Sequence, residues 1–166
     1  SITIGFEYSK IIKNCMYEYK YTGVKIIGTL IAQLLYYSCS IPNCDYITYV
    51  PLHSSKLKKR GFNQSEEIAV QLGRLLKKPV ISILEKNKPG VSQMSIKDKI
   101  QRQKNLQGTL IFSPKVSKIE TALLANKTIL LVDDIYTTGS TLECCAQLIT
   151  QHTTATVCAI CFAHKS

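Results

Sequence analysis

The stretch ILLVDDIYTTGST, residues 129–141, joins an apolar run to a polar segment of unusual composition. Its first four residues are aliphatic, and such a continuous run is typical of a strand buried on both faces in a parallel sheet. Asp133 and Asp134 follow directly, with no Lys or Arg near them in sequence. The stretch ends in five hydroxylic or glycine residues: Thr137, Thr138, Gly139, Ser140 and Thr141. An acid pair and a cluster of hydrogen-bond donors therefore meet at the end of one strand.

The residues from Ser140 onward, STLECCAQLITQH, have the pattern of a helix. A helix start carries free backbone N–H groups and the positive end of the helix dipole, which suit a phosphate. The hydroxyl groups add donors, and Gly139 lets the backbone approach a ligand closely. Carboxylates repel a phosphate, but they accept hydrogen bonds from a sugar diol or hold a divalent cation through water. A ligand with a ribose diol and a 5′-phosphate satisfies both halves of the stretch.

Strands and helices are expected to alternate along the rest of the chain. Apolar spacing predicts two N-terminal helices, broken at Gly23, and a third whose Asn63 and Glu66 have the spacing of a capping box. The predicted helices are 7–21, 24–38, 63–78 and 140–152, and the predicted strands are 46–52, 79–86, 108–112, 127–134 and 154–163. Residues 117–126 fit a helix or an irregular connection, and 87–108 fit a long loop. This order predicts an α/β sheet whose ligands bind beyond the carboxyl ends of its strands.

Composition restricts the class of protein. The chain has 166 residues, enough for one domain with its own core. No stretch of about 18 residues, the length of a membrane helix, is free of both charged and strongly polar residues. No secretory signal is apparent at the start, and seven scattered cysteines fit a reducing cytoplasm. The net charge of +10 favours nucleic acid or phosphorylated ligands, although a Lys-rich solvated surface explains it equally well.

Two cysteine spacings invite a zinc assignment. Cys39 and Cys44 are separated by four residues, and Cys158 and Cys161 form a C-x-x-C pair. The second pair falls in a predicted strand, where positions three apart point to opposite faces. We therefore expect core cysteines that behave as small apolar residues.

Two other interpretations of the opening stretch are weaker. An apolar strand ending in acids also occurs in P-loop ATPases, but these need a G-x-x-x-x-G-K-[ST] loop, and none of the eight glycines precedes a lysine. A capped helix start with solvent-exposed acids needs no ligand at all. It leaves the combined order of acids, threonines and glycine unexplained.

The stretch resembles the 5-phosphoribosyl 1-pyrophosphate (PRPP) binding motif of type I phosphoribosyltransferases: four apolar residues, two acids, two variable residues, then T-T-G-S-T. The resemblance implies that Asp133 and Asp134 contact the ribose hydroxyls and that Thr137 to Thr141 bind the 5′-phosphate. It also implies Mg²⁺, bridging pyrophosphate and sugar oxygens and held indirectly by the two acids. In a transferase, pyrophosphate departs from an oxocarbenium-like carbon that a nitrogen nucleophile attacks.

A second group of motifs resembles the ComF family of competence proteins: P-L-H at Pro51, a basic run, R-G-F-N-Q at Arg60, Y-K-Y-T-G at Tyr19 and R-x-x-N-x-x-G at Arg102. The basic run lies in a predicted loop, and we assign His53, Lys56 and Arg60 to the pyrophosphate. An alternative without a ligand is open for each of them: His53 fits a histidine packed near a turn, and Lys56 and Arg60 fit solvated cations on the surface. Arg102 joins Asp133 and Asp134 as a catalytic candidate, whereas Phe62 fits a core anchor and Asn63 a helix cap.

The resemblance implies a type I phosphoribosyltransferase fold, with a mostly parallel sheet of about five strands flanked by helices and a flexible loop. We expect a single domain over 1–166, with a helical N-terminal hood over 1–45 and a PRPP-binding core over 46–166. Members of the ComF family often carry an N-terminal four-cysteine zinc finger, for which this chain has no matching cluster.

Two functions follow from the resemblance. The first is a cytoplasmic competence protein that binds PRPP and Mg²⁺ and assists uptake or processing of single-stranded DNA in natural transformation, with DNA and other competence proteins as partners. The second is a phosphoribosyltransferase acting on a small base or amine. No motif identifies the acceptor, so both functions remain open.

Overall fold

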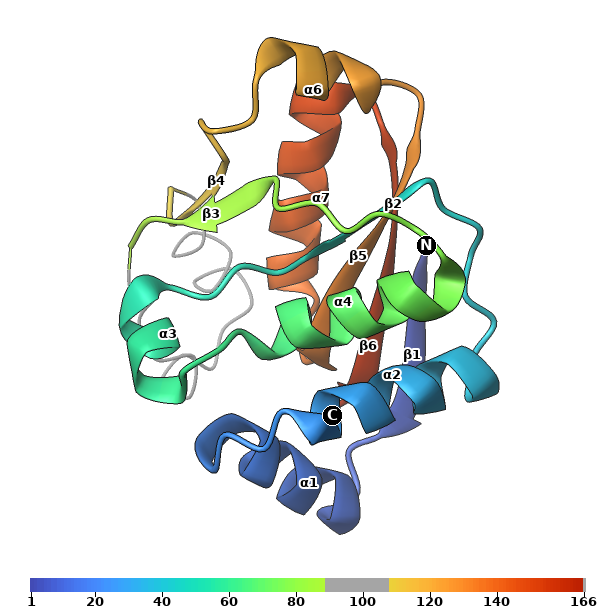
Figure 1. The fold of residues 1–166 in the computed structure, drawn as a ribbon, viewed down its shortest axis with the longest axis vertical. Coiled ribbons are helices and arrows are strands. Elements are labelled where there is room, and N and C mark those ends of the chain that lie inside the picture. Colours follow the sequence, from blue (N-terminus) through green and yellow to red (C-terminus); the bar gives the residue numbers. More distant parts are fainter. Residues whose placement is uncertain (89–107, 166) are drawn as a thin grey trace.

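The computed structural model describes residues 1–88 and 108–165, which form an α/β fold (Figure 1). In chain order the elements are β1 (Ile2–Glu7), α1 (Lys10–Tyr21), α2 (Ile26–Ser38), β2 (Tyr46–Tyr49), α3 (Ser54–Arg60), α4 (Gln64–Leu76), β3 (Leu84–Lys86), β4 (Leu110–Phe112), α6 (Lys118–Leu123), β5 (Thr128–Tyr136), α7 (Ser140–Thr153) and β6 (Thr156–His164).

The main sheet has four strands in the order β1-β6-β5-β2, and all three pairings are parallel. Strand β5 lies inside the sheet between β6 and β2, so its backbone is paired on both sides. Residues Ile129–Val132 are completely buried, as a continuous aliphatic run predicts for a central parallel strand. The predicted α/β class and parallel sheet are confirmed.

The main sheet has four strands, whereas about five were expected. The run 79–86 is divided between two sheets: Val80 forms an isolated parallel bridge with Ile47 of β2, whereas β3 pairs antiparallel with β4. Hydrogen bonds from Ile47 N to Pro79 O (2.9 Å) and from Ile81 N to Ile47 O (2.8 Å) hold the first part beside the main sheet. The second part leaves the sheet and forms a two-stranded ribbon.

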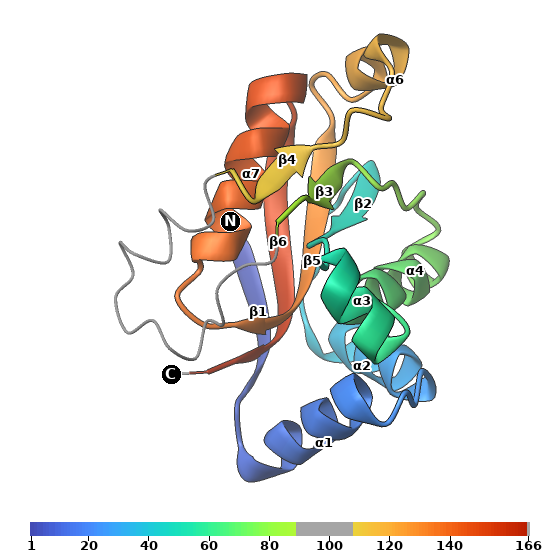
Figure 2. The same cartoon turned by 90° about the vertical axis from the view of Figure 1, so that its left-hand side faces the viewer.

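The two faces of the sheet bury separate cores. Leu130 and Val132 pack with residues of α1, α2 and α4, whereas Ile129 and Leu131 pack with residues of α7 and the β3–β4 ribbon. This division follows from the two-residue period of a strand. Figure 2 shows α7 on one side of the sheet and α2 and α4 on the other.

Cys158 and Cys161 follow the same rule on β6. Cys158 belongs to the core under α2 and α4 and Cys161 to the core under α7, so the two thiols lie on opposite faces as predicted. All seven cysteines are free. Within residues 1–88 and 108–165, no three His, Cys, Asp or Glu side chains are grouped so as to hold a metal ion.

Two segments differ from their predictions. The first residues form β1, which pairs with β6, whereas no strand was predicted there. The basic segment after Pro51 is helix α3 and not a loop, with His53 as its N-cap and Gly61 ending it at φ 81°. The helices predicted around Gly23 are present, and Gly23 has φ 75° between them. None of the helices described is long and apolar enough to cross a membrane.

Candidate functional site

The acid pair lies within β5, which extends beyond the predicted strand end at residue 134. Asp133 is paired with Cys161 of β6, and the strand continues to Tyr136, which is paired with His164. The strand therefore runs past the acids, and its backbone holds them at the carboxyl end of the sheet. Helices α1 and α3 border this end, and α6 lies at the opposite end of the molecule (Figure 2).

Asp133 is held by α4. Its Oδ1 atom accepts hydrogen bonds from Ser65 Oγ (2.9 Å) and from the backbone N–H of Asp134 (2.9 Å). Burial, together with the adjacent charge of Asp134, raises the pKa of Asp133 above its usual range. The first acid is therefore fixed in orientation, at an electrostatic cost when it is ionised.

Asp134 is held by α1. The Lys20 ammonium lies 2.6 Å from Asp134 Oδ2, and the two side chains are only 18% and 14% exposed. Lys20 was not among the residues that the sequence predicted for the site. Although no cation is near the acids in sequence, the fold supplies one from a helix more than a hundred residues away.

The hydroxyl-rich segment begins α7. Gly139 has φ 77° and precedes the first helical residue, Ser140, which is buried. The hydroxyl oxygens of Thr138 and Ser140 are 3.1 Å apart. No side chain caps the start of α7. The positive φ favours glycine, and a Cβ at position 139 would also lie 2.8 Å from the Tyr136 hydroxyl oxygen, so any other residue here would have to displace the Tyr136 ring.

The predicted pyrophosphate residues are dispersed over α3. His53 Nδ1 lies 3.2 Å from Ser55 N and caps the helix, while Lys56 is exposed. Arg60 instead faces the N-terminal helices: its Nη1 donates to Gln64 Oε1 (3.0 Å), and its guanidinium lies 5.7 Å from the ring centroid of Tyr21. Arg102 lies outside the residues that the structure describes.

The R-G-F-N-Q and Y-K-Y-T-G motifs pack against each other. The Tyr19 hydroxyl donates to Gln64 O (2.9 Å), and its ring lies 5.4 Å from that of Phe62. Phe62 is buried, as expected of a core anchor. Asn63 caps α4, because its Oδ1 accepts from Ser65 N (3.1 Å). Glu66, predicted to complete a capping box, instead accepts from the Tyr49 hydroxyl (3.0 Å).

Ser65 and Lys86 are two further residues that the sequence did not single out. Ser65 orients Asp133, as described above. Burial and the nearby positive charge of Lys56 lower the pKa of Lys86, whereas Asp133 acts in the opposite direction. Lys86, the last residue of β3, is therefore a second cation within electrostatic range of Asp133. Because these contacts join distant parts of the chain, no local sequence pattern indicates them.

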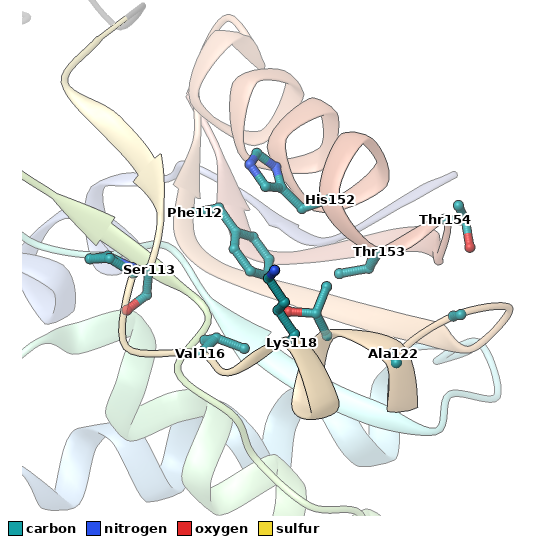
Figure 3. Close-up of a pocket in the computed structure, with 11 residues that line it drawn as sticks. Phe112, Ser113, Val116, Lys118, Ala122, His152, Thr153 and Thr154 are labelled. Carbon is teal, nitrogen blue, oxygen red and sulfur yellow. The ribbon is translucent and has the colours of Figure 1, made fainter.

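A separate cavity of about 540 Å³ lies between β4, α6 and the C-terminal end of α7 (Figure 3). Phe112 and His152 line it, with their rings stacked at 4.6 Å and nearly parallel. Because α7 has 14 residues, this cavity lies roughly 20 Å from the hydroxyl-rich segment. It contains none of the predicted ligand residues.

The chain is similar to two proteins that are named as competence proteins. The chain is similar to Competence protein F of Haemophilus influenzae, with 36% identity over 63% of this chain and 44% of that protein. It is also similar to Competence protein ComFC of Streptococcus pneumoniae, with 28% identity over 83% of this chain and 56% of that protein. The chain thus spans about half the length of the curated relatives it matches.

The fold also matches a solved structure, that of adenine phosphoribosyltransferase from Thermoanaerobacter pseudethanolicus. The TM-score is 0.52 at 13% sequence identity, covering 87% of this chain and 84% of that one. Residues 55–166, which contain α3 except its first residue, α4, the acid pair and the hydroxyl-rich segment, match the phosphoribosyl transferase domain family. The chain therefore belongs to the phosphoribosyl transferase domain family.

Proposed function

We propose that this chain binds PRPP together with Mg²⁺ at the carboxyl end of β5. The observation that carries the proposal is the arrangement of the opening stretch. Two oriented carboxylates lie beside a helix start that has no side-chain cap and is rich in hydroxyl groups. Asp133 and Asp134 would accept from the ribose hydroxyls, and residues Thr137 to Thr141 would donate to the 5′-phosphate.

The side chains present fit an indirectly held Mg²⁺. The described residues lack a cluster of three candidate ligands, so an ion at this site would rely mainly on oxygens of PRPP and water. Asp133 and Asp134 would hold it through water, and the ion would neutralise pyrophosphate charge. Lys56 remains exposed beside this end of the sheet and is a candidate for the pyrophosphate, as is His53. Arg60 would need to leave Gln64 to take that role.

Calorimetry with Mg²⁺ and PRPP tests this assignment. Replacing both Asp133 and Asp134 with Asn should weaken binding strongly, because both acceptors lose their charge. Glu18→Gln is the matched control, since Glu18 is an exposed acid on α1. Unchanged affinity in the double variant would overturn the site, whereas an equal loss in the control would point to general electrostatics.

We further propose that PRPP binding serves a competence role in which the protein assists uptake or processing of single-stranded DNA, in contact with other competence proteins. The two relatives named as competence proteins support this role. Exposed aromatic residues beside cations suit stacking and phosphate contacts. Tyr17 and Tyr21 are exposed on α1 with their rings 4.9 Å apart, and Arg60 lies over Tyr21.

Family membership favours a second function, transfer of the phosphoribosyl group from PRPP to a small base or amine. The acceptor would bind under a hood built from α1 and α2. Measuring PRPP consumption with a panel of bases, amines and DNA separates the two functions. Turnover on a small base supports transfer; salt-sensitive DNA affinity without turnover supports the competence role. Absence of DNA affinity at moderate salt would eliminate direct DNA contact.

A further inference from the structure

Lys20 reaches the acid pair from a firmly held position. The preceding residue, Tyr19, is completely buried and donates its hydroxyl hydrogen to Gln64 O at 2.9 Å. Helix α2 passes close enough to Tyr19 that a Cβ on Gly28 would lie 2.5 Å from the Tyr19 hydroxyl oxygen. The last turn of α1 is therefore clamped between α2 and α4. Lys20 extends from this turn to Asp134.

The carboxylate oxygens of the acid pair are used asymmetrically. Asp133 is bound through Oδ1, by Ser65 Oγ and the Asp134 N–H, and Asp134 is bound through Oδ2, by Lys20. Among residues 1–88 and 108–165, no hydrogen bond is made to Asp133 Oδ2 or Asp134 Oδ1, and the short Lys20 contact is to Asp134 Oδ2. Each acid thus has one oxygen fixed by the protein and one oxygen left for a ligand. A ribose diol offers two hydroxyl donors, one for each of these oxygens.

We propose that Lys20 is a positioning residue of the PRPP site. It fixes Asp134 through Oδ2, and Oδ1 is thereby directed to a ribose hydroxyl, as Ser65 does for Asp133. Lys20 also offsets the repulsion between two adjacent carboxylates in a partly enclosed site. This inference rests on the proposed binding of PRPP. It adds that the hood helix α1 completes the ribose subsite of the core.

A rival role gives the opposite result. If Lys20 occupied the place of the ligand and had to be displaced, its removal would strengthen binding. Under the positioning role, its removal weakens binding, because Asp134 loses its fixed orientation. The sign of the change in affinity therefore separates the two roles.

The test is calorimetric titration of wild type, Lys20→Met, Lys20→Arg and Lys13→Met with Mg²⁺ and PRPP. Lys13 is an exposed cation on the same helix, so it controls for the lost charge. We expect about tenfold weaker binding in Lys20→Met, the size of effect of one charge-assisted hydrogen bond. Lys20→Arg should recover most of the loss, and Lys13→Met should bind like wild type. Lys20→Gln serves as the neutral variant if Lys20→Met does not fold.

Ligand truncation distinguishes positioning from general destabilisation. The loss in Lys20→Met should be larger for ribose 5-phosphate than for inorganic phosphate, which lacks the diol. In an Asp134→Asn background, Lys20→Met should cause no further loss. Equal affinity in wild type and Lys20→Met, or tighter binding in the variant, would overturn the inference and leave the proposed function intact. A wild-type protein that binds neither PRPP nor ribose 5-phosphate would overturn both.

Discussion

Tyr19→Phe tests whether the attachment of α1 to the core has the strength that the structure indicates. The substitution removes a hydroxyl that donates to Gln64 O at 2.9 Å and leaves the buried ring in place. Burial and the nearby charges of Glu67 and Asp134 raise the pKa of Tyr19, so this hydroxyl stays protonated and able to donate under ordinary assay conditions.

The expected loss is moderate. Gln64 is the first residue of α4, so its carbonyl also accepts a helical hydrogen bond and is not left unpaired by the substitution. Losing one neutral hydrogen bond costs about 1 kcal/mol of unfolding free energy. For a chain of this size, that corresponds to a fall in Tm of roughly 2–4 °C. Urea denaturation and a thermal melt followed by circular dichroism measure both quantities.

Tyr17→Phe is the matched control. Tyr17 lies on the same helix, and its side chain is 61% exposed. Its hydroxyl makes no hydrogen bond to a described residue, so the change in unfolding free energy should stay within about 0.5 kcal/mol. If Tyr19→Phe were as stable as Tyr17→Phe, the reasoning about the α1 attachment would be wrong.

Two further predictions concern the opening stretch. Gly139→Ala should weaken PRPP binding, because it adds a contact with Tyr136 to the strain of φ 77°; Gly23→Ala, with φ 75° and nothing within 4 Å, should leave affinity unchanged in the same titration. The raised pKa of Asp133 means that the folded state holds its proton more tightly than the unfolded chain, so the unliganded protein loses stability as pH rises through the folded-state pKa. Asp133→Asn should therefore be more stable than wild type at pH 8 and similar to it near pH 4 in urea denaturation, and a less stable variant at pH 8 would contradict the assignment.

The sequence predicts the parts of the fold that local patterns determine. Strand β5 is recognisable because central parallel strands are apolar on both faces, and α4 because its apolar positions recur at helical spacing. Helix α3 was predicted as a loop because none of its residues is buried, so its sequence has no apolar periodicity. Its His53 cap and the left-handed Gly61 define it instead.

Strand β1 was not predicted, for a different reason. Its identity depends on pairing with β6, at the other end of the chain, and it contains Gly5, which is uncommon inside strands. The structure explains this glycine, since a Cβ there would lie 2.7 Å from Leu35 Cδ2 and 2.8 Å from Phe162 O. Close packing of α2 over the strand is invisible from the sequence around residue 5.

In the candidate site, too, the sequence indicates the residues that form a local pattern and not those that come from distant parts of the chain. The motif at 129–141 identified the acids and the hydroxyl-rich segment, because these residues are contiguous and their chemistry is local. Ser65 and Lys20 reach the acids from two different helices. No spacing rule connects such residues. The orientation of Arg60 also depends on its contacts with Gln64 of α4 and Tyr21 of α1, which the basic run alone does not determine.

The pairing of β1 with β6 affects how the protein is made. Ile2 of β1 lies beside Ala159 of β6, a separation of 157 residues (159 minus 2). Among the described residues, β1 has no other sheet partner. During synthesis β1 therefore leaves the ribosome long before its partner exists, and its backbone N–H and C=O groups stay without their sheet partner until β6 emerges. Completion of the sheet is thus a late step in biogenesis, and the newly made chain needs protection from aggregation until that step.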